Sequence, residues 1–125
     1  MEIEPSAPIV NCRDLRIYQQ SYQAALEIHR VTLKFPAFER GELGSQLRRA
    51  SKSIPMNIAE GYGRRRSALD FKRFLAIALG SCDEVSVLLD FLRDLNYLEN
   101  EAHAEWKKRY DEIGKGINKL IQVWR

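Results

Sequence analysis

The sequence predicts an all-α protein, folded as an antiparallel, up-down-up-down four-helix bundle. Four segments repeat apolar residues at intervals of three and four, the spacing that places them on one side of a helix. Short links containing Pro, Gly or Asn join these segments, and no segment alternates apolar and polar residues as a half-buried strand does. Since the chain has 125 residues and 45% apolar content, it fits one domain with its own core.

The beginning of the chain differs from the rest. It contains Pro5 and Pro8 and shows no periodicity, so we expect an extended or disordered arm at residues 1–13 and the bundle domain at residues 14–125. The arm has acidic residues where a signal peptide would be basic, and no apolar run approaches membrane-spanning length. We therefore expect a cytoplasmic protein with no membrane partner.

The first helix is expected over residues 14–35, with Asp14 as its N-cap and Pro36 as its stop. Its apolar residues occupy two nearly opposite faces, whereas a helix of a monomeric bundle needs only one. We therefore expect a second copy of the chain to cover the other face, which predicts a homo-oligomer. His29 lies in the apolar arc, where a core histidine with satisfied polar atoms is a better interpretation than a ligand. One face carries Leu15, Tyr18, Tyr22, Ala25, Leu26, His29 and Leu33, and the other carries Ile17, Ala24, Ile28, Val31 and Phe35.

The second helix is expected over residues 42–60, after a connection at residues 35–44. Pro55 removes one backbone donor, so the helix should kink or restart there. Beside an apolar stripe runs a continuous polar row, for which two interpretations exist: a hydrogen-bonded seam between helices or subunits, and a ligand site. We expect the structural seam. The row consists of Gln46, Arg49, Ser53, Asn57 and Glu60.

Two members of the polar row cannot satisfy each other. Arg49 and Glu60 are eleven residues apart, about 16 Å along a helix, so they cannot pair on a straight one. We expect the partners of both to lie on other helices or other chains.

Glycines and a serine mark the boundary between the second and third helices. Gly61 and Gly63 suit a helix end that needs a left-handed residue. Ser67, followed three residues later by Asp70, resembles a capping box and predicts a third helix over residues 67–95.

The second half of the chain continues the bundle pattern. Gly80 lies inside the third helix, and we expect close approach of another helix to compensate its unfavourable helix propensity. Cys82 falls on the apolar face and should be a small buried residue, and its distance from Cys12 argues against a disulfide framework. The fourth helix is expected over residues 101–123, with core residues at alternating steps of four and three.

Catalytic chemistry is not expected. The sequence contains no glycine-rich phosphate loop, nucleophile elbow, HExxH motif or cluster of metal ligands. A di-iron bundle needs Glu-x-x-His, but the histidines after Glu27 and Glu101 follow at two residues. We therefore predict no catalytic residue, no cofactor and no metal.

Positive charge is concentrated in one part of the chain. Between Arg40 and Arg73 nine basic residues face three acidic ones, a local balance of +6, while the whole chain carries +3. Such a surface could contact phosphates without reading sequence. The candidate nucleic-acid-binding residues are Arg48, Lys52, Arg64, Arg65, Arg66, Lys72 and Arg73.

Three runs of sequence carry a family resemblance. The run RRASKSIPMNIAEGYGR, preceded by DLRIYQQSYQAALEIHRVTLKFP and followed by FKRFLAIALGSCDEV, resembles the four helix bundle protein family encoded in 23S rRNA intervening sequences. The chain is more distantly similar, in architecture, to the accessory variability determinant protein of diversity-generating retroelements. The resemblance implies a homopentamer that binds RNA or other nucleic acid, with no established biochemical activity.

Together, these observations favour a non-enzymatic oligomeric bundle that binds RNA or DNA with low specificity. One alternative is a helix-turn-helix-like DNA-binding protein, because a glycine turn followed by a basic helix occurs after residue 60. The other is a protein–protein scaffold without nucleic acid. The nucleic-acid target, and the identity of any nucleic-acid-processing protein partner, stay open.

Overall fold

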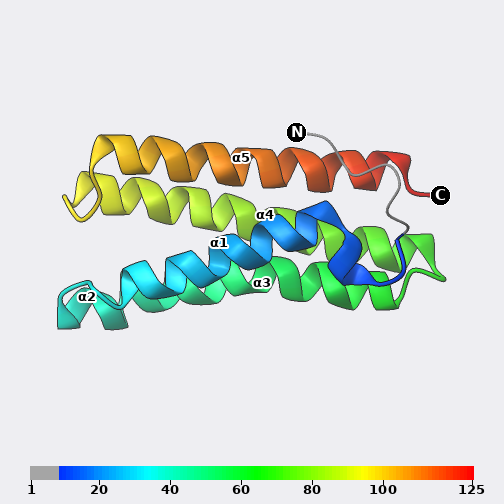
Figure 1. Ribbon diagram of the computed structural model, residues 1–125, viewed down its shortest axis with the longest axis horizontal. Helices are drawn as coiled ribbons and strands as arrows, with labels where there is room; N and C mark the ends of the chain where they lie inside the picture. The colour runs from blue at the N-terminus through cyan, green and yellow to red at the C-terminus, as the bar shows by residue number, and fades with distance from the viewer. Residues whose placement is uncertain (1–8) are drawn as a thin grey trace.

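A computed structural model describes residues 9–125, and within this range the chain forms helices and no strands. Four long helices lie side by side, and the short helix α2 sits at one end of the molecule, near the connection from α4 to α5 (Figure 1). The predicted all-α class and helical bundle are therefore confirmed. The elements are the 3-10 helix η1 (Cys12–Asp14) and the α-helices α1 (Arg16–Thr32), α2 (Ala37–Gly41), α3 (Leu43–Gly63), α4 (Ala68–Asp94) and α5 (Asn100–Val123).

The core lies between the four long helices. α3 packs against both α1 and α4, and α4 also packs against α5, whereas α1 and α5 touch more sparsely. Every long helix contributes side chains that are fully buried, as its apolar periodicity predicts. They include Ile28, Leu47, Ile54, Ile58, Phe71, Leu75, Leu89, Leu92, Ile113 and Ile117. No helix among the described residues is long and apolar enough to cross a membrane.

The start of the bundle differs from the prediction. Asp14 is not the N-cap of α1: the cap position is Leu15, whose side chain makes no capping bond. The Asp14 carboxylate instead accepts hydrogen bonds from the backbone N–H groups of Val10 (2.7 Å) and Asn11 (3.1 Å), while Asn11 caps η1. These bonds lower the pKa of Asp14. The predicted arm at residues 1–13 lies mostly outside the described residues, and η1 already begins near its end.

α3 runs without interruption from Leu43 to Gly63, so the restart expected at Pro55 does not occur. The prediction that Gly61 or Gly63 adopts a left-handed conformation at the helix end is also wrong, because no described glycine has a positive φ. Gly61 serves packing instead. A Cβ there would lie 2.8 Å from the Cβ of Phe74 and 3.0 Å from a ring carbon of Phe71, so its missing side chain allows α3 and α4 to approach closely.

The start of α4 agrees with the prediction, since the Ser67 hydroxyl accepts a hydrogen bond from the backbone N–H of Asp70 at 3.1 Å. Cys82 is buried as expected. The prediction that another helix approaches Gly80 closely is wrong, because a Cβ there would meet no atom within 4 Å among the described residues. Besides the approach at Gly61, a second close approach occurs at Gly116 of α5, where a Cβ would lie 2.7 Å from Ile17 of α1.

The two apolar faces of α1 are covered to different extents. Ile17, Ala24 and Ile28 are buried, whereas Tyr22 on the other face is 45% exposed. His29 is half-buried at the edge of this second face, so it is not a core histidine.

Candidate nucleic-acid interface

The turn between α3 and α4 carries the three consecutive arginines predicted as a nucleic-acid contact. Arg64, Arg65 and Arg66 are all exposed. Backbone hydrogen bonds from Arg64 to Gly61 (2.9 Å) and from Arg65 to Tyr62 (3.2 Å) continue the helical turn and hold the connection in place. The arginines therefore project from an ordered turn.

Two of the cations of this region flank one aromatic ring. The guanidinium carbons of Arg64 and Arg73 lie 5.2 and 5.4 Å from the ring centre of Phe74. Each arginine also pairs with an acid, Arg64 with Glu60 at 3.0 Å and Arg73 with Asp70 at 3.4 Å. Ring and acid together orient the guanidinium groups while leaving them largely in solvent.

The other two arginines of the turn, Arg65 and Arg66, have no acidic partner among the described residues. Arg65 lies 4.1 Å above the ring centre of Tyr62 and donates to its carbonyl at 2.9 Å. Arg66 makes no hydrogen bond or ion pair within residues 9–125. We call Arg64, Arg65, Arg66, Lys72 and Arg73, which lie close together in the sequence, the basic turn. Lys72 is half-buried and makes no hydrogen bond or ion pair among the described residues. The five positive charges of the basic turn face two nearby acids, Glu60 and Asp70, which leaves a local balance of +3.

Arg48 and Lys52 do not belong to the basic turn. Arg48 donates to the hydroxyl of Thr32 and to the carbonyl of Arg40, both at 3.0 Å, and so ties α3 to the end of α1 and to α2. Lys52 donates to Nδ1 of His29 at 3.0 Å. Both side chains face α1, and Arg48 lies about 24 Å along α3 from the basic turn. The structure therefore does not gather all seven candidates into one continuous surface.

The polar row lies along the seam between α3 and α4. The hydroxyls of Ser53 and Ser81 share a hydrogen bond of 2.9 Å across this seam. Asn57 donates to the carbonyl (2.8 Å) and the hydroxyl (3.0 Å) of Ser53. These three half-buried residues thus connect two helices of the same chain.

The ends of the polar row are more exposed. Arg49 reaches Glu84 of α4 at 4.0 Å, with the two side chains 71% and 48% exposed, and Gln46 is also exposed. The partner of Glu60 is Arg64, only four residues later, so the expectation that its partner lies on another helix or chain is wrong. The reason is that α3 continues three residues beyond the predicted end.

A second polar cluster, between α4 and α5, was not identified from the sequence. Asp90 accepts hydrogen bonds from Nε2 of His103 (2.7 Å) and from Nζ of Lys107 (3.0 Å), and these bonds lower its pKa. Lys107 also donates to the carbonyl of Ser86 at 3.3 Å. These residues come together only through the packing of α4 on α5, so no local sequence pattern predicts the cluster.

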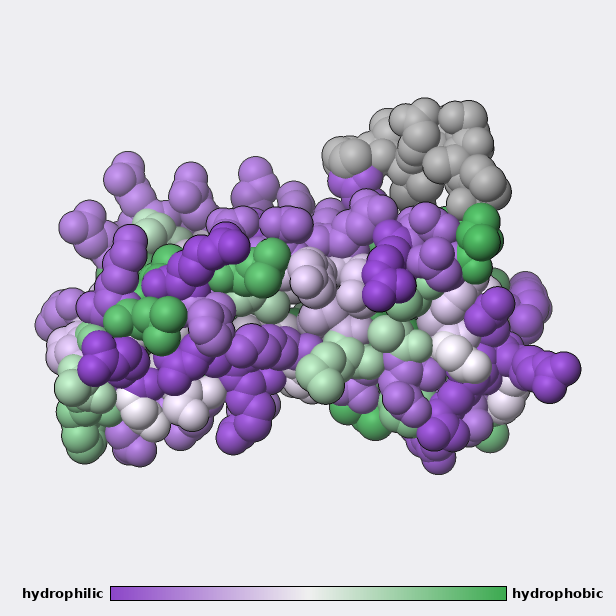
Figure 2. Space-filling model, turned by 60° about the horizontal axis from the view of Figure 1, so that its bottom comes forward, coloured by the Kyte–Doolittle hydropathy of each residue, from purple (hydrophilic) through white to green (hydrophobic). Residues whose placement is uncertain are grey.

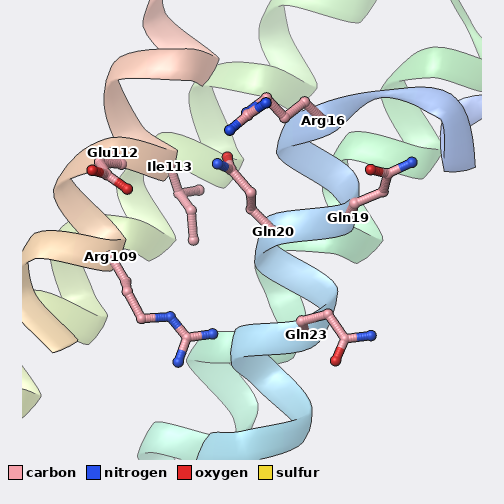
Figure 3. Close-up of a pocket in the computed structure, with 7 residues that line it drawn as sticks. All are labelled: Arg16, Gln19, Gln20, Gln23, Arg109, Glu112 and Ile113. Carbon is pink, nitrogen blue, oxygen red and sulfur yellow. The ribbon is translucent and has the colours of Figure 1, made fainter. Parts of the chain in front are cut away.

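A groove between α1 and α5 is also lined mainly by polar side chains. Gln20 and Arg109 point across it from opposite helices (Figure 3). It encloses about 370 Å³. Amide, guanidinium and carboxylate groups line it, without a nucleophile next to a base, and the described residues contain no group of three potential metal ligands. The lining residues are Arg16, Gln19, Gln20, Gln23, Arg109, Glu112 and Ile113.

Fold and surface define a helical bundle protein with an arginine-rich turn. The chain belongs to the family of 23S rRNA-intervening sequence proteins, whose sequence profile matches residues 13–119. A solved structure from Bacteroides thetaiotaomicron VPI-5482, described as a protein of unknown function from the S23 ribosomal protein family, is similar in fold. The two chains are 27% identical and superpose with a TM-score of 0.77 over 86% of this chain and 96% of that one. None of the curated proteins compared with this chain matches it.

Proposed function

We propose that this protein is a non-enzymatic bundle that binds RNA or DNA phosphates through the basic turn, with little sequence specificity. The observation that carries this proposal is the concentration of five cations, two of them on the first turns of α4, against two acids. Guanidinium groups donate in a fork that matches phosphate oxygens, and phosphate contacts alone do not discriminate between bases.

The position of the arginines supports an anionic partner. Arg64 and Arg65 follow the C-terminus of α3, where the helix dipole favours cations. Arg66 directly precedes Ser67, the N-cap of α4, where the dipole is positive and a cation raises the electrostatic free energy of the unbound protein. Stacking on Phe74 and Tyr62 holds three of the guanidinium groups in place before binding. Less side-chain freedom is then lost when a phosphate binds.

We also propose that the four long helices form an antiparallel, up-down-up-down subunit of a homo-oligomer, for which the family resemblance favours five copies. Exposed hydrophobic residues lie among hydrophilic ones on the surface (Figure 2). Among the described residues, the exposed large hydrophobic side chains include Tyr22 of α1 and Phe91 of α4, which are 45% and 54% exposed. An oligomer would repeat the basic turn in every subunit, and several weak phosphate contacts would then act together.

The helix-turn-helix alternative is less well supported. A recognition helix must enter the major groove, but the first turns of α4 bury Phe71, Leu75 and Ala78 completely. The exposed apolar surfaces favour a protein–protein scaffold as the second candidate function. A nucleic-acid-processing protein is the partner class that would combine both functions.

Fluorescence anisotropy with labelled single-stranded RNA and duplex DNA tests the proposal. We expect both to bind at low salt, with an affinity that falls steeply as salt rises, because bound phosphates release counterions. Replacing Arg64, Arg65 and Arg66 by Ser should weaken binding to all sequences similarly and flatten the salt dependence.

The matched control replaces three exposed lysines of α5, Lys108, Lys115 and Lys119, by Ser, which changes the net charge equally. This control should retain most of the affinity. Absence of binding by the wild type, or equal loss in both triple variants, would contradict the proposal.

A further inference from the structure

An apolar groove runs along the outer surface between α1 and α3. It encloses about 480 Å³ and is lined mainly by hydrophobic side chains, among them Tyr22 of α1 and Met56 of α3. Tyr22 is 45% exposed and Met56 is 67% exposed. His29 and Lys52, joined by a hydrogen bond, also line the groove and give it a basic edge.

A row of hydrophobic side chains projects from the outer face of α4. Ile77, Val87 and Phe91 are 46%, 54% and 54% exposed, and their spacing places them along one side of the helix. Gly80 and Glu84 lie between them on the same side. We call these five residues the α4 ridge. The opposite side of α4 faces the core, so this helix is apolar on both sides, as is typical of a helix that is buried all round.

The apolar groove and the α4 ridge cannot meet within one chain. α1 and α3 form the groove, whereas the ridge points outward from α4, on the far side of α3. The two surfaces are nevertheless complementary. The groove is concave and edged by Lys52, while the ridge is convex and carries Glu84, whose only ion pair among the described residues is a loose one of 4.0 Å.

We propose that the α4 ridge of one copy docks into the apolar groove of the next copy. This inference rests on the proposed homo-oligomer and names the surfaces that form it. Because the two surfaces differ, each copy that uses its ridge keeps its groove available, and the contact is head-to-tail. The surfaces lie on either side of α3, so successive copies are rotated relative to each other, which allows the chain of contacts to close as a ring.

Two substitutions of exposed residues test the apolar groove and the α4 ridge separately. Met56→Glu places a charge in the groove, and Phe91→Glu places the same charge on the ridge. Light scattering on a size-exclusion column should find the wild type assembled and each variant monomeric, with helical content by circular dichroism unchanged. Phe38 of α2, which is 74% exposed and belongs to neither surface, supplies the control: Phe38→Glu should remain assembled.

Mixing the two variants is the decisive step. The intact ridge of the Met56→Glu chain can dock into the intact groove of the Phe91→Glu chain. The groove and the ridge left free in this complex are both mutated, so no further copy can be added and we expect a heterodimer. Two mutated surfaces cannot pair because their charges repel. The mixture is measured at hundreds of micromolar, and a mixture that stays monomeric there overturns the inference.

Other outcomes are equally informative. If Met56→Glu dissociates the protein and Phe91→Glu does not, the groove pairs with another groove and the head-to-tail contact is wrong. If both variants remain assembled, the subunits associate through other surfaces, and only this inference fails. A monomeric wild type contradicts the proposed homo-oligomer itself, and the docking inference with it.

Discussion

Glu27 and Arg109, which are 82 residues apart, form a bidentate ion pair that joins α1 to α5 with distances of 2.8 and 3.0 Å. Arg109 also lies 4.5 Å above the ring centre of Trp106. The pair joins α1 and α5, which touch more sparsely than α3 does with α1 or α4 does with α5. Hydrogen bonding to Arg109 lowers the pKa of Glu27, so the ionised carboxylate is favoured in the folded protein.

Arg109→Lys should therefore weaken the closure of α1 on α5. Lysine retains the charge but not the two parallel hydrogen bonds or the stacking on Trp106. Both side chains of the pair are partly in solvent, so we expect a loss of about 0.5 kcal/mol in the free energy of unfolding. Urea denaturation measures it, and a double-mutant cycle with Glu27→Gln isolates the pair. A coupling energy of zero would show that the pair does not stabilise the fold.

Gly61→Ala should destabilise the protein by about 1–3 kcal/mol, since the added Cβ would overlap Phe74 and force α3 and α4 apart. Gly63→Ala is the matched control in the same helix, where a Cβ meets no atom within 4 Å. Alanine there should be neutral or stabilise by up to about 1 kcal/mol. Equal melting temperatures for the two variants would contradict the proposed role of Gly61 in packing.

Asp90 should make the free energy of unfolding depend on pH in the acidic range. Its pKa is lowered from the ordinary 3.8 by hydrogen bonds from His103 and Lys107, so its stabilising contribution is complete above that value and is lost as the pH falls below it. Asp90→Asn should remove this part of the pH dependence. Denaturation at neutral pH and at a series of acidic values compares the two proteins, and parallel stability curves would argue against the prediction.

The polar row should act as a structural seam. Ser53→Ala leaves the hydroxyl of Ser81 without its partner, so we expect a loss of about 1 kcal/mol in the free energy of unfolding. Arg49→Ala should change stability much less, because Arg49 is largely exposed and its pair with Glu84 is long. If both variants keep full stability but lose nucleic-acid binding, the row is a ligand site.

The fold was largely predictable because burial of one side of a helix leaves a periodic trace in the sequence. The boundaries of the helices were less predictable. Asn11 and Asp14 are both residue types that suit a helix N-cap, and only the backbone geometry shows that Asn11 caps η1 while α1 starts without a side-chain cap. Gly61 and Gly80 illustrate a similar limit. A glycine is compatible with a turn or with close packing, and the neighbouring helix decides which.

Candidate site residues were harder to predict than helices. Arg64, Arg65 and Arg66 are adjacent in sequence, so their proximity in space follows directly. Arg48 was grouped with them through its charge alone, but its hydrogen bonds to Thr32 and the Arg40 carbonyl depend on how α1, α2 and α3 meet. Pairs such as Glu27 and Arg109 depend on tertiary packing in the same way.

The location of bound RNA tests the central claim most directly. Ultraviolet crosslinking of the intact protein to single-stranded RNA, followed by mass spectrometry, identifies the peptides in contact with it. We predict crosslinks to residues 62–74, which contain the basic turn together with Tyr62 and Phe74, and we predict their loss in the triple Ser variant. Crosslinks confined to α5 or to the groove between α1 and α5, or their persistence in that variant, would contradict the account.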